Sequence, residues 1–159
     1  METTPLIAYL SGGMENAQNE GAGWRNDMTN WLNEKLGHET INPVLESKKL
    51  VISHGAEEYK DWKMTNHGKY KEFIRLIINQ DLRAVIAKVD YLIVLWDESI
   101  LYGGGTHGEV TMAYWVDRPI FMVNKLPKEK LSGWISSCST ETFDSFNELK
   151  KALLTEFKS

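Results

Sequence analysis

The sequence has little cysteine, no excess of positive charge and no long apolar run, and each shortage excludes a class of protein. Cys138 is the only cysteine in 159 residues, so the chain can form neither an internal disulfide nor a cysteine-based metal cluster. Such cysteine usage fits a reducing cytoplasm, which is the expected location. The net charge of −4 offers no basic footprint for a nucleic-acid polymer. No apolar run approaches ~20 residues, so we expect no membrane-spanning helix.

Common cofactor and metal motifs are also missing. The chain has no Walker A sequence, and the glycine-rich residues 103–108 do not match the dinucleotide-binding pattern. His38, His54 and His67 are not paired with other ligands at metal-binding spacing. The first residues are acidic and lack the basic region of a signal peptide. We therefore expect no bound cofactor, no metal and no secretory leader.

What is present is an alternation of strand and helix patterns. Apolar runs predict strands and 3.6-residue apolar spacing predicts helices. The predicted strands are residues 6–10, 38–41, 90–96 and 119–123, with a fifth inside 134–143; the predicted helices are residues 24–36, 72–88, 106–116 and 145–157. Residues 44–71 are interpreted as an irregular insertion with one helical turn near 57–62. The alternation predicts one α/β domain over residues 1–159, a doubly wound, flavodoxin- or Rossmann-like sandwich with about five parallel strands.

The chain is organised around residues 90–109. A wholly apolar strand there ends at Trp96, as expected for the middle of a parallel sheet, and a charged, glycine-rich loop follows it. Loops after such strands are where α/β sheets bind their ligands. Gly103 and Gly105 belong to a run of three glycines that allows close approach of backbone to a ligand.

Glu109 has two interpretations. Residues 106–109 fit the capping box S/T-x-x-E, in which Thr106 caps the helix and the Glu109 carboxylate bonds only the cap backbone. Alternatively, Glu109 is an ionised carboxylate at a helix N-terminus, able to attack an electrophilic sugar carbon. Gly108 favours the second interpretation, because a cap does not need glycine and a substrate lying against the backbone does.

Other candidates lie at the same edge of the predicted sheet. Tyr9 is near the end of the first strand, Asp97 ends the third, and Asn124 follows the fourth. Asp81 lies in the preceding helix, where it is either a second carboxyl group that hands a proton to a leaving group or a surface residue. Tyr9 is equally interpreted as a core aromatic. His107 is a candidate proton shuttle.

Four segments together resemble the nucleoside 2-deoxyribosyltransferase superfamily, which includes the 2'-deoxynucleoside 5'-monophosphate N-glycosidases. They are Tyr9-Leu-Ser-Gly-Gly13, Asn42-Pro43, residues 80–90 (QDLRAVIAKVD) and Gly105-Thr-His-Gly-Glu109, and together they span most of the chain, roughly residues 6–124. The resemblance implies an enzyme without cofactors that acts on a small deoxynucleoside or deoxynucleotide and a nucleobase. It also implies a homo-oligomer, for which Trp24, Trp31, Tyr114 and Trp115 are candidate contacts.

The resemblance implies a role for each matching residue. Glu109 corresponds to the nucleophile that attacks C1' and forms a glycosyl-enzyme intermediate. Asp81 corresponds to the acidic residue that contacts the base or sugar during proton transfer, and Tyr9 to the tyrosine that positions the nucleophile. Gly12 and Gly13 correspond to the loop beside the sugar.

The sequence departs from the family at the 5' end of the substrate. Gly103 replaces the acidic residue of the transferases and the serine of the monophosphate enzymes, and Glu15 replaces an expected basic residue. Arg25 is either a substitute for that basic residue or a surface side chain. The expected activity is cleavage of the N-glycosidic bond with transfer to another base. The alternatives are a hydrolase, in which water takes the sugar, and a non-catalytic nucleotide-binding module.

Overall fold

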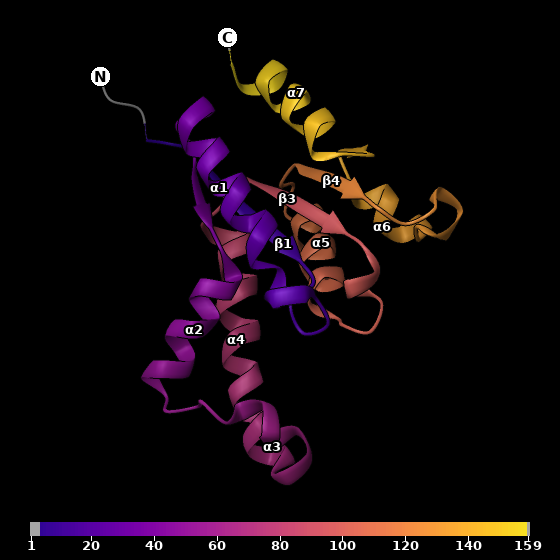
Figure 1. The fold of residues 1–159 in the computed structure, drawn as a ribbon. Coiled ribbons are helices and arrows are strands. Elements are labelled where there is room, and N and C mark those ends of the chain that lie inside the picture. The colour runs from indigo at the N-terminus through magenta and orange to yellow at the C-terminus, as the bar shows by residue number, and fades with distance from the viewer. Residues whose placement is uncertain (1–3, 159) are drawn as a thin grey trace.

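The computed structural model describes residues 4–158, which form a five-stranded parallel sheet with helices on both faces (Figure 1). The strands are β1 (Ile7–Gly12), β2 (Glu39–Ile41), β3 (Tyr91–Trp96), β4 (Ile120–Asn124) and β5 (Glu141–Phe143). Their order in the sheet is β2-β1-β3-β4-β5. This order and the parallel pairing confirm the predicted doubly wound α/β sandwich.

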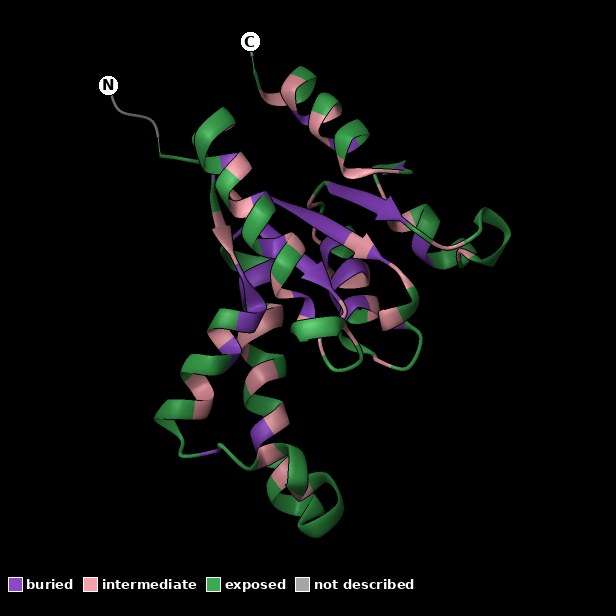
Figure 2. Cartoon of the chain, viewed as in Figure 1, coloured by how far each residue is buried: buried purple, intermediate pink, exposed green. Residues whose placement is uncertain are grey.

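Two apolar clusters hold the layers together. On one face, α1 (Ala22–Leu36) and α7 (Phe146–Phe157) bury Met28, Leu32 and Leu149 against the sheet. On the other face, α4 (His67–Ala87), α5 (Gly105–Trp115) and α6 (Gly133–Cys138) bury Val85, Val110 and Ile135. The central strands are buried on both sides, which explains why β3 and β4 are almost wholly apolar (Figure 2).

All strands are parallel, but successive strands are added to opposite sides of β1, so the topological switch point lies between β1 and β3. From β1 the chain crosses to β2 on one side, and β3 lies on the other side of β1. The loop after β1 contains the short helix η1 (Gln18–Gly21), and the loop after β3 contains η2 (Glu98–Ile100). These two loops diverge from neighbouring strands, and a crevice of this kind is where such sheets bind ligands.

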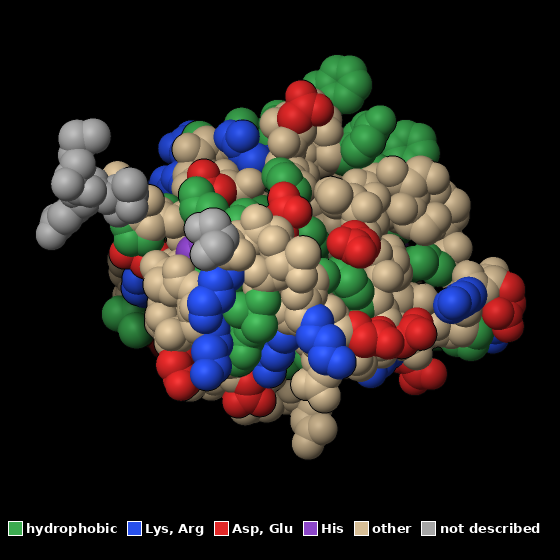
Figure 3. All heavy atoms as spheres, turned by 90° about the horizontal axis from the view of Figure 1, so that it is seen from above, with side chains coloured by type: hydrophobic (Ala, Val, Ile, Leu, Met, Phe, Trp, Pro, Cys, Tyr) green, Lys and Arg blue, Asp and Glu red, His purple; other side chains and the backbone are tan. Residues whose placement is uncertain are grey.

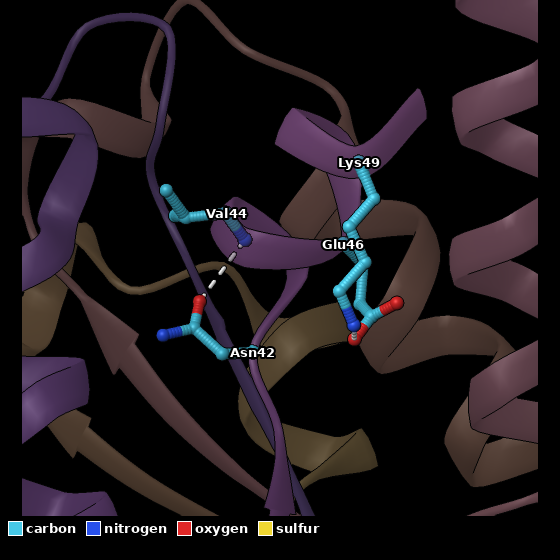
Figure 4. Close-up of polar contacts among 4 residues, drawn as sticks. All are labelled: Asn42, Val44, Glu46 and Lys49. Carbon is cyan, nitrogen blue, oxygen red and sulfur yellow. Dashed lines mark hydrogen bonds and ion pairs between the residues drawn. The ribbon is translucent and has the colours of Figure 1, made fainter. Parts of the chain in front are cut away.

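Residues 44–71 are helical, so their interpretation as an irregular insertion is wrong. α2 (Pro43–Ser53) and α3 (Tyr59–Thr65) occupy most of the segment, and α4 begins at His67, five residues before the predicted start. The Asn42 side chain caps α2 by accepting a hydrogen bond from the Val44 N–H at 3.0 Å, and Pro43 occupies the first turn (Figure 4). An Asn-Pro pair is a helix-start signal, which the sequence analysis did not use at Asn42-Pro43.

The segment from α2 through α3, residues 43–66, is here called the helical arm. With the first half of α4 it projects below the sheet in Figure 1, and Figure 2 shows it largely exposed. It is nevertheless anchored, because Phe73 of α4 is 4% exposed and contacts the rings of Tyr59 and Trp62 at centroid distances of 5.0 and 6.4 Å. The arm therefore presents a fixed wall beside the carboxyl edge of the sheet.

The C-terminal third matches the prediction in part. β5 lies within residues 134–143 as expected, but α6 fills the first half of that segment. Ser145 caps α7 as predicted, accepting from the Glu148 N–H at 3.2 Å, while the Glu148 carboxylate accepts from the Asp144 N–H at 3.0 Å.

On the face seen in Figure 3, acidic and basic side chains are interspersed and no surface of one sign forms.

Candidate active site

Glu109 is the centre of a buried hydrogen-bonded group. It lies in the second turn of α5 and is 6% exposed, while Tyr9 and Ser11 of β1 are both 0% exposed. Residues two apart on a strand face the same way, so both β1 hydroxyls point to α5. The Tyr9 phenol donates to one carboxylate oxygen of Glu109, and Ser11 Oγ donates to the other at 2.7 Å. The carboxylate is therefore held at both oxygens by the central sheet.

The capping-box interpretation of Glu109 is wrong. The N-cap of α5 is Gly104, which makes no side-chain capping bond, and Thr106 already lies inside the helix. The Glu109 carboxylate turns to the sheet instead of to the backbone of its own first turn. Its orientation depends on β1, about a hundred residues earlier in the chain, which spacing along the sequence cannot reveal.

Burial and hydrogen bonding shift the pKa of Glu109 in opposite directions. The pKa of its carboxyl group is raised above the ordinary value because burial outweighs the Tyr9 and Ser11 hydroxyls and the Arg25 charge, which lower that pKa by favouring the anion. Burial, followed by the neighbouring Glu109 charge, raises the pKa of the Tyr9 phenol well above its ordinary value. Tyr9 therefore remains a proton donor to Glu109 at neutral pH.

Asp81 is the second carboxyl group of the site. Burial, and then the nearby charge of Glu109, raise its pKa to about 8. Asp81 consequently carries a proton at neutral pH. Two carboxyl groups with different environments, one supplied with hydroxyl donors and one kept protonated, are the usual arrangement for a nucleophile or base beside a general acid.

Arg25 organises the loop that follows β1. It is 0% exposed, so the surface interpretation is wrong. Its guanidinium donates to the backbone carbonyls of Leu10 at 3.1 Å, Gly12 at 2.9 Å and Glu20 at 3.0 Å, with further bonds to the carbonyls of Gly13 and Gly21. All three guanidinium nitrogens are thus engaged with backbone carbonyls of β1 and of the loop that follows it, so Arg25 is not a free ligand for a phosphate.

A cavity of about 620 Å³ opens beside these groups at the carboxyl edge of the sheet. This is the size range of small-molecule sites. The predicted residues that line it are Gly12, Gly13, Asp81, Gly103, Gly105, Thr106, Gly108 and Glu109. Gly13 is required by packing, because an added Cβ would lie 2.0 Å from Ser99 Oγ. At Gly108 a Cβ would meet no described atom within 4 Å, so packing within the described chain does not explain that glycine.

Three predicted residues lie elsewhere. Asp97 caps η2, accepting from the Ser99 N–H at 2.9 Å, and lines an adjoining cavity of about 420 Å³, which shares Gly13 and Ser99 with the first. The His107 ring contacts Trp96 edge-on at 4.7 Å. Asn124 bonds both backbone groups of Leu126, at 3.0 and 3.1 Å, and so shapes the loop after β4.

Sequence reasoning did not single out Ser11 or the apolar wall of the cavity. Ser11 stands two residues after Tyr9, and this strand spacing was the available signal. Ile74, Ile77 and Ile78 of α4 line the cavity, whereas the apolar spacing of this segment predicted only that residues 72–88 form a helix. Among residues 4–158, no group of three or more His, Cys, Asp or Glu side chains is placed to hold a metal. No helix in the described part of the chain is long and apolar enough to span a membrane.

No protein-family model and no curated protein matches this sequence. The fold, by contrast, is similar to that of a solved 2-deoxyribosyltransferase from the psychrotolerant bacterium Bacillus psychrosaccharolyticus, described as a biocatalyst for the synthesis of antiviral and antitumoral nucleosides. The TM-score is 0.61 over 91% of this chain and 90% of that chain, at 14% sequence identity. At this identity the likeness establishes a shared fold, and it confirms the fold expected from the sequence resemblance.

Proposed function

We propose that the protein is a nucleoside 2-deoxyribosyltransferase-like enzyme, which cleaves the N-glycosidic bond of a 2'-deoxynucleoside or its nucleotide and passes the sugar to another nucleobase. The observation that carries the proposal is the pair of carboxyl groups in one cavity. Glu109 accepts two hydroxyl hydrogen bonds, and Asp81 has a pKa of about 8. The similarity in fold to a 2-deoxyribosyltransferase supports the same reaction class.

The proposed reaction has two covalent steps. In the first, a carboxylate oxygen of Glu109 attacks C1', the C1'–N bond breaks, and the base leaves with the proton of Asp81. In the second, a ring nitrogen of another base attacks C1', the ester bond to Glu109 breaks, and Asp81 recovers a proton from the incoming base. Tyr9 and Ser11 hold the Glu109 carboxylate in position throughout.

The geometry of this attack favours 2'-deoxy substrates. A carboxylate that lies close beneath C1' leaves little room for a 2'-hydroxyl group. We expect tens- to hundreds-fold higher kcat/KM for 2'-deoxynucleosides than for ribonucleosides, the range that steric exclusion gives. Equal rates on deoxyadenosine and adenosine would contradict this placement of the sugar.

The reaction can be tested with mixtures of deoxynucleosides, deoxynucleotides and free bases. Chromatography distinguishes base exchange from release of free sugar, and the second result identifies an N-glycosidase that uses the same first step. Binding of nucleosides without either product would point to a binding module.

The role of Glu109 can be tested by Glu109→Gln, which keeps the size of the side chain and removes its nucleophilic charge. We expect activity to fall by at least about 10³-fold, because only positioning remains. Glu98→Gln is the matched control, since Glu98 is an exposed glutamate of η2. A slow 2'-fluoro substrate should leave its sugar on the peptide that contains Glu109. An equally active Glu109→Gln enzyme would rule out the covalent mechanism.

A further inference from the structure

The cavity extends well beyond the two carboxyl groups. Tyr70, Ile74, Ile77 and Asp81 of α4 all line it, at the i, i+4, i+7 and i+11 spacing of a single helix face. Eleven residues of α-helix span about 16 Å at 1.5 Å per residue. This is longer than a nucleoside, so a substrate reacting between Glu109 and Asp81 would leave the outer half of the cavity unfilled.

The base end of the substrate faces this outer half. In the proposed function, Asp81 gives its proton to the leaving base, so the base lies against α4. Continuing outward along the same helix face, the next cavity-lining side chains are Ile78, Ile77 and Ile74. A substituent on the base therefore extends along this isoleucine wall.

The isoleucine wall is apolar surface that the folded core does not use. Ile78 is 46% exposed and Ile74 and Ile77 are half-buried, and these three side chains belong to neither of the two described core clusters. Apolar surface that lines a cavity and stays accessible to solvent is favourable for binding an apolar ligand group.

Two ion pairs line the outer part of the cavity. Lys63 of α3 pairs with Glu15 at 3.0 Å, and Lys60 pairs with Glu20 at 3.7 Å; these four side chains all line the cavity. Each positive charge already faces a negative one from the loop after β1. The rim therefore carries no net charge to attract an anionic substituent, which leaves an apolar group as the better match.

We propose that the cavity binds nucleobases that carry an extended apolar substituent, and that the substituent lies along Ile74, Ile77 and Ile78. This inference rests on the proposed function for the direction of the base. It names the substrate class as base-modified deoxynucleosides or deoxynucleotides. The helical arm, fixed on Phe73, supplies the far wall of this subsite through Tyr59.

The substrate class can be tested with two graded series, 5-alkyl-2'-deoxyuridines and N6-alkyl-2'-deoxyadenosines, from methyl to hexyl. In at least one series, kcat/KM should rise about threefold per added methylene, as expected for burial of apolar surface. Values that stay level or fall with alkyl length in both series would overturn the inference.

The location of the subsite can be tested by narrowing it. Ile74→Trp should remove the rise with alkyl length, and so should Ile78→Trp, which changes a more exposed position and keeps the test valid if the first variant does not fold. Leu76→Trp is the matched control, because Leu76 is a 39% exposed residue of the same helix that does not belong to the wall. If folded Ile74→Trp and Ile78→Trp enzymes showed the same rise in kcat/KM with alkyl length as the wild type, the assignment of the subsite would be overturned.

Calorimetry with the Glu109→Gln protein separates this inference from the proposed reaction. The Kd of free 5-alkyluracils or N6-alkyladenines should fall with alkyl length without any turnover. Such binding, in a wild-type protein that cleaves no substrate, would support the subsite and contradict the reaction. Turnover of unsubstituted substrates without tighter binding of alkylated bases would contradict only the subsite.

Discussion

At the scale of single residues, the site depends on how β1 presents two hydroxyl groups to one carboxylate. Tyr9 and Ser11 face α5, where Tyr9 also belongs to the apolar core, and their hydroxyls reach both oxygens of Glu109. Hydrogen bonds to a charged group are worth roughly 1.5–3 kcal/mol. Together they offset part of the penalty that burial imposes on the anion.

Tyr9→Phe and Ser11→Ala are therefore expected to lower kcat/KM by roughly ten- to hundredfold each. Each substitution removes a donor that lowers the pKa of Glu109, so the acid limb of the pH profile should move to higher pH. Steady-state kinetics across pH 4–9 would measure this. The shift distinguishes a role in charge stabilisation from simple packing, and variants that lose rate with an unchanged acid limb would contradict it.

The raised pKa of Asp81 leads to a separate prediction for the pH dependence of kcat/KM. A protonated Asp81 is needed to release the base, so kcat/KM should decline above pH 8, the pKa to which burial raises this carboxyl. In Asp81→Asn this basic limb should disappear, and the rate should drop least for bases that leave easily.

The same shift links Asp81 to stability. Between about pH 4 and pH 8 the folded protein holds a proton that the unfolded chain has released, so this group lowers the free energy of unfolding as pH rises. Asp81→Asn should be more stable than wild type at pH 8, by on the order of 5 kcal/mol for a shift of about four pKa units, and equally stable near pH 4. Urea unfolding at the two pH values would test this, and an Asp81→Asn protein that is less stable at pH 8 would contradict it.

At the scale of elements, the loop after β1 is held by one side chain of α1. The Arg25 guanidinium donates to five backbone carbonyls, of Leu10 and Gly12 at the end of β1 and of Gly13, Glu20 and Gly21 in the loop. Asn19 and Glu20 have positive φ angles of 50° and 54°, an uncommon conformation that must be held by surrounding contacts. The position of Gly12 and Gly13 beside the cavity therefore depends on Arg25.

Arg25→Lys should lower the free energy of unfolding by roughly 1–3 kcal/mol, because a lysine cannot satisfy the same set of buried carbonyls. Activity should fall about tenfold as the loop loses its fixed position, with the acid limb of the pH profile retained because the charge remains. Arg25→Met should in addition move the acid limb of the pH profile to higher pH, since the Arg25 charge lowers the pKa of Glu109. Identical pH profiles for the two variants would argue that the arginine acts only through packing.

At the scale of the whole molecule, the structure divides the four aromatic residues proposed for subunit contact. Trp24 stacks on Phe146 at 5.7 Å and Trp31 is half-buried against the same core cluster, so both are engaged within the chain. Tyr114 and Trp115 of α5 are 54% and 78% exposed. Trp134 of α6 is 69% exposed, and its indole N–H donates a hydrogen bond to the Thr111 hydroxyl at 3.1 Å. Thr111 lies one helical turn before Trp115 in α5. Large exposed aromatics in one region suit the centre of an interface.

We predict a homo-oligomer that uses this aromatic surface. Light scattering at micromolar concentration should give at least twice the chain mass of 18.2 kDa. Trp115→Glu should reduce that mass, because a buried unpaired charge disfavours association. Met64→Glu, at an 89% exposed site on α3, serves as the control. A wild-type monomer of 18.2 kDa would remove the prediction.

The sequence by itself determined the strand-helix alternation and the central position of β3. Apolar runs define β3 and β4 because a strand covered on both faces must be apolar, and Gly37 ends α1 because its φ of 67° suits glycine. The placement of Glu109 and the loop glycines at one edge also follows from sequence, since parallel strands end together, whereas the strand pattern left Asp81 as either a site residue or a surface residue. The helical arm was missed because its polar helices bury few side chains and leave weak apolar periodicity.

Only the tertiary structure decided what these residues do to one another. The capping box predicted from the S/T-x-x-E spacing at residues 106–109 is a local arrangement. It does not form, because the Glu109 carboxylate accepts hydrogen bonds from Tyr9 and Ser11 of β1 instead. Arg25 became a buried support because the loop after β1 folds back over α1. The pKa of Asp81 is raised by burial and by a charge on another helix, neither of which exists in the unfolded chain. Chemistry of this kind arises from distances between residues far apart in sequence, and folding alone sets them.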